Sequence, residues 1–143
     1  MDRHSFVAGA SQYSGTRAGL AEWLATPQGR HVLDWELEQF DRATEDAFGY
    51  RAVQVGVHRI DFLRANRIPF RFTLGLEHGA ALAADPMQLP LANHSVDLVA
   101  LPHALEGTAD PHLVLREAER VLVPEGQLVI SGFNPLSLWR LRQ

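Results

Sequence analysis

Residues 89–133, LPLANHSVDLVALPHALEGTADPHLVLREAERVLVPEGQLVISGF, decide the fold because they predict a strand, a helix and a second strand. Residues 96–101 are apolar apart from Asp97, as expected of a strand that is covered on both faces. Asp110 and Pro111 supply an N-cap and a first helical residue. The Pro-Glu-Gly at 124–126 is expected to end the helix before a buried strand over 127–133. Together these elements predict one right-handed βαβ unit.

The predicted helix is amphipathic, with an apolar side that faces the sheet and a charged side in solvent. The apolar positions are Val114, Leu115, Ala118, Val121 and Leu122, and the charged ones are Arg116, Glu117, Glu119 and Arg120.

Three spaced motifs in this segment are typical of one protein family. They read LPLANHSVDLV at 89–99, LPHALE at 101–106 and RVLVPEGQLVI at 120–130. The segment resembles the second half of class I S-adenosylmethionine-dependent methyltransferases of type 11. The resemblance implies an α/β fold, a Rossmann-like three-layer sandwich with a mainly parallel sheet, and S-adenosylmethionine as cofactor. The sheet is expected to be incomplete relative to the full methyltransferase fold, because the family continues through two strands beyond the equivalent of residue 133.

Composition limits the function classes. The chain has 143 residues, of which 46% are apolar, so we expect a single domain with a proper core. A net charge of −4 disfavours nucleic-acid binding, and the absence of cysteine excludes disulfides and thiolate metal sites. The seven histidines form no pair at helical spacing, so no metal is expected. No apolar run has the length of a signal peptide or a membrane span, which predicts a cytoplasmic protein without a membrane partner.

The first half is predicted to contain an N-terminal arm and a lid-like helix within residues 1–48. The helix is expected from Pro27 to Phe48, with Thr26 as N-cap, Gly49 as left-handed C-cap and a solvated acidic face. The α/β core is assigned to 50–133 and an apolar tail to 134–143. Strands are predicted at 52–57 and 70–76 with a short helix over 58–66 between them, and 77–88 has no clear pattern.

The turn after the first core strand is where the resemblance places the cofactor's amino-acid part. The family carries Asp-x-Gly-x-Gly-x-Gly there, whereas this chain has Gln54 for the acid, Gly56 for the first glycine, and His58 and Ile60 for the other two. Side chains at lost glycine positions occupy ligand space or alter the turn. The sequence therefore predicts weak cofactor binding, with a dissociation constant above micromolar.

Two acids are candidates for the rest of the cofactor. The resemblance implies that Glu77 holds the ribose hydroxyls and that Asp85, followed by Pro86, accepts from the adenine amino group; a turn that opens at Asp85 is the alternative. Parallel neighbours need a crossover of about a dozen residues. Because Glu77 and Asp85 are only eight positions apart, we expect the third strand to be absent or the sheet to be rewired there.

Pro102 and His103 follow the strand over 96–101, where the resemblance implies a pocket floor. An imidazole titrates near neutral pH, so His103 is the candidate general base. A surface or hydrogen-bonding role for His103 is the alternative.

Three functions remain open from the sequence. The first is methyl transfer from S-adenosylmethionine to an unknown acceptor, and the second is a methyltransferase-like interaction or dimerisation module without cofactor. An unflanked strand at 127–133 and an apolar tail predict a homodimer; the apolar tail residues are Leu136, Leu138, Trp139 and Leu141. The third is nucleic-acid binding through a basic island; its residues would be Arg51, Arg59, Arg64, Arg67 and Arg71 between Phe62, Phe70 and Phe72.

Overall fold

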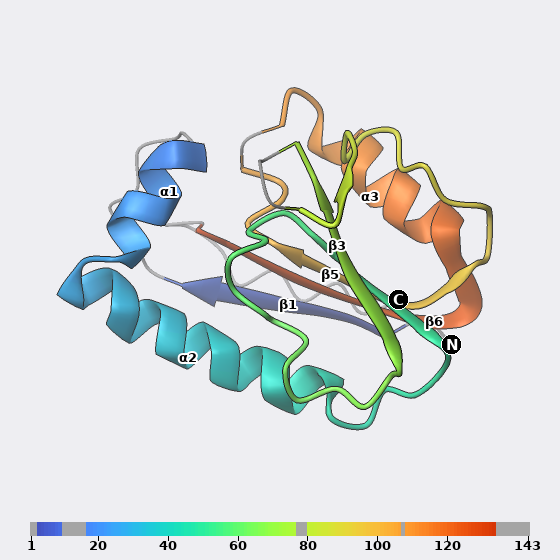
Figure 1. Cartoon of the computed structure of the whole chain (residues 1–143), viewed down its shortest axis with the longest axis horizontal. Helices are drawn as coiled ribbons and strands as arrows, with labels where there is room; N and C mark the ends of the chain where they lie inside the picture. The colour runs from blue at the N-terminus through green and yellow to red at the C-terminus, as the bar shows by residue number, and fades with distance from the viewer. Residues whose placement is uncertain (1–2, 10–16, 77–79, 107, 134–143) are drawn as a thin grey trace.

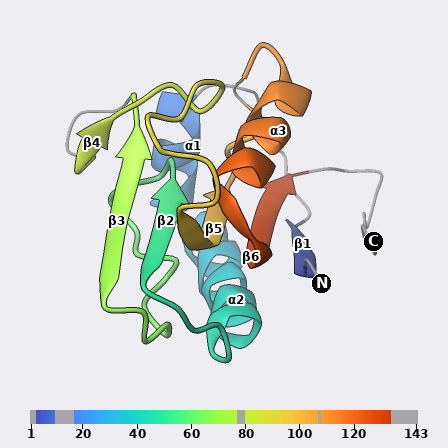
Figure 2. The ribbon, with the colours of Figure 1, turned by 90° about the vertical axis from the view of Figure 1, so that its right-hand side faces the viewer.

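A computed structural model describes residues 3–9, 17–76, 80–106 and 108–133 and shows a six-stranded sheet between helices (Figure 1). The strand order is β1-β6-β5-β2-β3-β4, and every pairing is parallel (Figure 2). The predicted α/β fold with a parallel sheet is confirmed, including the central β2–β5 pair and the placement of β6 beside β5. The elements are β1 (Arg3–Gly9), α1 (Arg17–Leu24), α2 (Pro27–Thr44), β2 (Arg51–Val55), β3 (Phe70–Gly75), β4 (Leu82–Ala83), β5 (Val96–Pro102), α3 (Pro111–Val121) and β6 (Leu122–Phe133).

Helices α2 and α3 cover opposite faces of the sheet, below and above it in Figure 1. Side chains alternate between the faces of a strand, so β5 feeds both cores. Leu98 and Ala100 pack in the cluster that contains Phe40 of α2, whereas Val99 packs in the cluster that contains Ala118 of α3. Burial of both faces explains why β5 reads as a continuous apolar run.

Helix α2 begins as predicted but ends early. The Thr26 side chain accepts a hydrogen bond from the Gly29 amide at 3.1 Å, which confirms it as the N-cap. The helix ends at Thr44 rather than Phe48, because the Thr44 carbonyl accepts a hydrogen bond from the Asn66 side-chain amide at 2.8 Å instead of continuing the helix. Gly49, at φ +150°, is not the helix C-cap. Helix α2 packs as a layer of the core through Leu37 and Phe40. Its lid-like role stays a prediction, as does the division of the chain into arm, core and tail.

Helix α3 has the predicted N-cap, because the Asp110 side chain accepts from the amides of His112 and Leu113. The expected stop at residues 124–126 is wrong, since the helix ends at Val121 and β6 begins at Leu122. Leu122 pairs with Val96, and the next pairs follow a register shift. The Pro-Glu-Gly segment therefore lies in an irregular part of the ladder, where β6 advances from Leu122 to Gln127 while β5 advances only from Val96 to Leu98.

The two ends of the sheet differ from the expectation. Residues 127–133 are not an edge, because β1 pairs with them in parallel from Arg3↔Gln127 to Gly9↔Phe133. This removes one argument for a homodimer; the tail at 134–143 lies outside the described residues, and the homodimer stays a prediction. At the other end, a two-residue β4 pairs in parallel with the end of β3. Because β4 has only two residues, the short segment between β3 and β4 suffices to connect them. This edge of the sheet is therefore rewired rather than empty.

Candidate functional site

The order of strands reverses between β2 and β5, because the chain proceeds from β2 towards β4 on one side and from β5 to β6 on the other. In such sheets ligands bind beyond the carboxyl ends of the strands at this reversal. The backbone there is unusual: Gly56 has φ +86°, Val57 has φ +48° and His103 has φ +54°. A β-branched residue such as Val57 adopts positive φ only at a cost, and such strain concentrates at functional sites.

The turn after β2 is held by the buried side chain of Gln54. Its Nε2 lies 3.0 Å from the carbonyl oxygens of Gly56 and Val57 and 2.8 Å from that of Ile60. Its Oε1 accepts from the Phe62 amide at 3.0 Å. Because this amide satisfies the backbone groups that a helix would pair, residues 58–66 form successive turns, and the predicted short helix is wrong. Both polar atoms of the Gln54 side chain, Nε2 and Oε1, are therefore hydrogen-bonded to the backbone of the turn.

Gly56 keeps the end of β2 open. A Cβ added at Gly56 would meet nothing closer than the Pro102 carbonyl oxygen at 3.8 Å. The Gly56 backbone is therefore not covered by neighbouring atoms on that side. The Gly56 amide donates to the Leu74 carbonyl at 2.8 Å, which fixes the turn against β3. His58 and Ile60, which stand at the other two glycine positions, are both partly buried. The left-handed turn has therefore survived at one of three glycine positions.

His103 lies at the end of β5 in a buried ionic cluster. Its Nε2 is 2.8 Å from Oε2 of Glu36 on α2, and its Nδ1 is 3.2 Å from Oε1 of Glu106. The His103 and Glu36 side chains are fully buried. Burial lowers the pKa of His103, but hydrogen bonds and charge interactions with Glu106 and Glu36 outweigh it and raise the pKa to about 9. The ring is therefore protonated at neutral pH, and both nitrogens donate.

The role of His103 as general base stays a prediction; the protonated ring would first have to lose one of the two protons that face Glu36 and Glu106. The sequence did not reveal its partners, since Glu36 is 67 positions away and stands on a helix whose polar face was read as solvated. Gly132 leaves room for the cluster: a Cβ there would lie 3.1 Å from Glu106 Oε1. Within the described residues, Oε1 of Glu36 is buried without a hydrogen-bond partner.

Asp85 opens a tight turn near the end of β3. Its Oδ1 accepts from the Met87 amide at 2.9 Å, and its carbonyl accepts from the Gln88 amide at 2.9 Å. The preceding residue, Ala84, donates to the Gly75 carbonyl at 3.0 Å. In the part of the chain that the structure describes, Oδ2 of Asp85 accepts no hydrogen bond. Pro86 is buried, and Glu77 lies outside the described residues.

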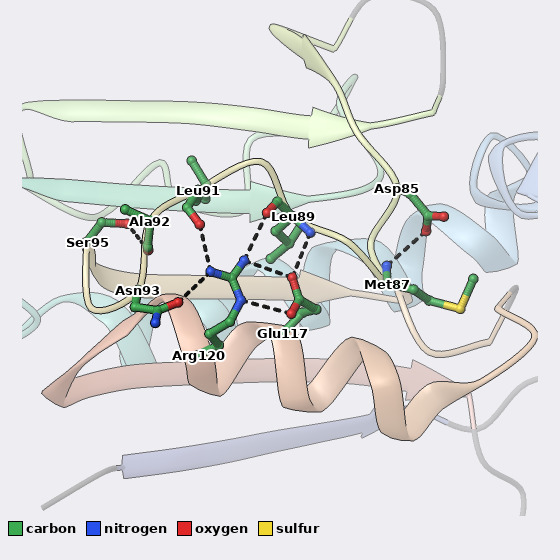
Figure 3. A network of polar contacts seen from close by, with 9 residues as sticks. All are labelled: Asp85, Met87, Leu89, Leu91, Ala92, Asn93, Ser95, Glu117 and Arg120. Atoms are coloured by element: carbon green, nitrogen blue, oxygen red, sulfur yellow. Dashed lines mark hydrogen bonds and ion pairs between the residues drawn. The ribbon is translucent and has the colours of Figure 1, made fainter.

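Helix α3 carries two polar side chains, Glu117 and Arg120, that were predicted to lie on its solvent face. Figure 3 shows Glu117 and Arg120 pointing into the loop that precedes β5. Arg120 donates to the Leu89 and Leu91 carbonyls at 2.9 and 2.8 Å, and Oε2 of Glu117 accepts from the Leu89 amide at 2.8 Å. The hydrogen bond with Arg120 lowers the pKa of Glu117. The available signal was the Glu–Arg pair three positions apart on a helix.

Three members of the predicted basic and aromatic island are engaged within the fold. Phe62 is fully buried against Phe40. Arg64 pairs with Asp41 at 2.7 Å, and Arg71 donates to the Leu63 carbonyl at 2.6 Å. These contacts hold the segment after β2 against α2 and its own backbone, and the nucleic-acid alternative stays untested.

Among the described residues, no group of three or more His, Cys, Asp or Glu side chains is arranged to hold a metal ion. Within the same ranges, no helix has the length and apolar character that crossing a bilayer requires.

Comparisons with known proteins agree with the fold. Residues 71–130 match the family model described as "Methyltransferase domain". The chain is 57% identical over 60 residues to the uncharacterized protein YafS of Escherichia coli, covering 42% of this chain and 25% of YafS. It is 46% identical over 52 residues to the demethylmenaquinone methyltransferase of Chlamydia pneumoniae, covering 36% and 23%. A chain in the Haloferax volcanii Trm112 methyltransferase activator complex superposes with a TM-score of 0.62 at 24% identity, covering 78% and 57%. The matched segments thus span a quarter or less of these two curated relatives.

Proposed function

We propose that this chain transfers a methyl group from S-adenosylmethionine. The proposal rests on its class I S-adenosylmethionine-dependent methyltransferase domain, which is partial relative to its homologues. The observation that supports this most is the open left-handed turn at Gly56, at the point where the strand order reverses between β2 and β5. A glycine turn at this place lets a ligand lie against backbone. The methyl acceptor is unidentified, and a cytoplasmic location is part of the proposal.

Two observations on the described residues support this proposal. A Cβ at Gly56 would be unobstructed, so the cofactor's amino-acid part would approach the backbone there, and Oδ2 of Asp85, which has no competing partner among the described residues, would accept from the adenine amino group. When bound, S-adenosylmethionine supplies an electrophilic methyl group on a sulfonium. Gly56 and Asp85 would bind and orient it between the ends of β2 and β3.

Binding is proposed to be weak, because the site lacks the acid of the family motif. Gln54 replaces that acid, and its amide is consumed by the carbonyls of Gly56, Val57 and Ile60. Each missing polar contact costs about 1 kcal/mol, and 1.4 kcal/mol is tenfold in affinity. We therefore expect a dissociation constant well above micromolar.

The Gln54 turn also favours a second candidate, a methyltransferase-like interaction module without cofactor. The Phe62 amide occupies Gln54 Oε1, so a ligand amine would have to compete with the protein's own backbone. Under this candidate the homodimer proposed from the apolar tail would be the functional form.

Isothermal titration calorimetry with S-adenosylmethionine and S-adenosylhomocysteine distinguishes the candidates. We expect binding in the upper micromolar range or weaker, which Asp85→Ala weakens more than Glu77→Ala. Glu119→Ala, an exposed acid on α3, is the matched control and should leave binding unchanged. Absence of binding at millimolar ligand would favour the interaction module. A larger loss in Glu77→Ala than in Asp85→Ala would overturn the placement of adenine at Asp85.

A further inference from the structure

Glu117 and Arg120 form hydrogen bonds with several backbone atoms of the loop between β4 and β5 (Figure 3). The Arg120 guanidinium donates to two carbonyls of the loop and, at 2.8 Å, to the Asn93 side chain. It is held in turn by both carboxylate oxygens of Glu117, each at 2.9 Å. A planar guanidinium presents five donors in a fixed fork, so this arrangement defines the position of the loop.

Leu89 is the residue held most closely. Its amide donates to Glu117 and its carbonyl accepts from Arg120. The turn opened by Asp85 closes on Gln88, the residue immediately before Leu89. On its other side, Ala84 is bonded to the end of β3. Asp85 therefore lies in a short segment fixed at both ends, by the sheet and by α3.

We propose that Glu117 and Arg120 are positioning residues for the cofactor, because they set where the Asp85 carboxylate meets the adenine amino group. This inference rests on the proposed function. Neither side chain would touch the ligand; both act through the backbone of Leu89. A hydrogen bond weakens steeply once its geometry departs from a linear approach near 3 Å, so a shift of the Asp85 turn would reduce recognition of the amino group.

Base selectivity separates positioning from general stability. A 6-oxo base presents an acceptor where adenine presents an amino donor, so S-inosylhomocysteine would set two acceptors against each other at Asp85. A site built to hydrogen-bond a donor rejects an analogue that lacks it. We expect the unchanged chain to bind S-adenosylhomocysteine about tenfold more tightly than S-inosylhomocysteine.

The test measures this ratio by NMR titration in Glu117→Gln and Arg120→Lys. Lysine cannot reproduce the bidentate contacts of arginine. Glu119→Gln and Arg116→Lys are matched controls, since both residues are exposed on the same helix. We expect the ratio to fall towards one in the first pair and to stay unchanged in the controls. An effect on stability alone would weaken both ligands equally and leave the ratio intact, which would overturn the positioning role.

A second measurement needs no ligand. Amide hydrogen exchange at Leu89 should be about tenfold faster in Glu117→Gln than in Glu119→Gln, because the Leu89 amide loses its charged acceptor. Unchanged exchange would show that the loop does not depend on Glu117 and would overturn the inference. Binding of neither ligand to the unchanged chain would overturn the proposed function, and the positioning role with it, whatever the exchange data show.

Discussion

After β2 the chain passes through Gly56 and Val57 at positive φ, and after β5 it passes through His103 at positive φ, so neighbouring strands end in similarly strained backbone. The two turns are stabilised by different chemistry. A neutral amide, Gln54, holds the first, whereas the second is held by an imidazolium between Glu36 and Glu106. The first turn should therefore be insensitive to pH and salt, and the second should depend on protonation.

The largest effect is expected from breaking the charged turn. His103→Leu leaves the Glu36 carboxylate fully buried without its partner, and such uncompensated charges cost about 3 to 5 kcal/mol. Urea denaturation at pH 7 measures the loss. His31→Leu, at an exposed position on α2, should change stability by less than about 0.5 kcal/mol. A loss below about 1 kcal/mol in His103→Leu would mean that Glu36 reaches water in solution.

The pH dependence sharpens the contrast. Because the folded pKa of His103 is raised to about 9 from an unfolded value near 6.5, the folded chain binds the proton more tightly. The stabilisation is fully present below pH 6.5 and is lost as pH rises through 9, by up to roughly 3 kcal/mol. Denaturation series between pH 6 and 10 should show this slope in the unchanged chain and in Gln54→Leu, but not in His103→Gln. A flat profile in the unchanged chain would contradict it.

The neutral turn should break with a smaller loss. Gln54→Leu removes the donor that Gly56, Val57 and Ile60 share and the acceptor of Phe62, which we expect to cost about 2 to 3 kcal/mol. Gln54→Glu restores the acid of the family motif but sets a carboxylate against three carbonyls, so it should be no more stable than Gln54→Leu. A stable Gln54→Glu with tighter cofactor binding would show that the turn can rearrange to the family geometry.

The smallest effect concerns backbone strain alone. At Val57 the glycine variant should be more stable than the alanine variant by about 1 kcal/mol, because only glycine adopts positive φ without cost. At Val55, the buried last residue of β2, the order should be reversed, since glycine weakens strands. Thermal denaturation of the four variants tests this. The same order at both positions would show that Val57 is not strained in solution.

The sequence predicted the second half of the molecule better than the first. Apolar patterning and two caps, Thr26 and Asp110, act locally, so the strands and helix starts could be inferred from neighbouring residues. The distant partners of His103 and Arg120, Glu36 and Leu89, are encoded by no local pattern. The same holds for β1, whose pairing partner is separated from it by more than a hundred residues. The sequence therefore singled out the strand ends at Gly56 and His103, where the backbone has positive φ, but it did not predict the groups that hold these turns.

The pairing of β1 with β6 has a consequence for the route by which the chain folds. Arg3 and Gln127 are among the most distant residues that the sheet joins, and contacts of such sequence separation are entropically costly and slow to form. Because β1 precedes β6 by more than a hundred residues, β1 is synthesised long before its partner exists. The β1–β6 pair is thus expected to form late, and until then the edge of β6 is open to other chains.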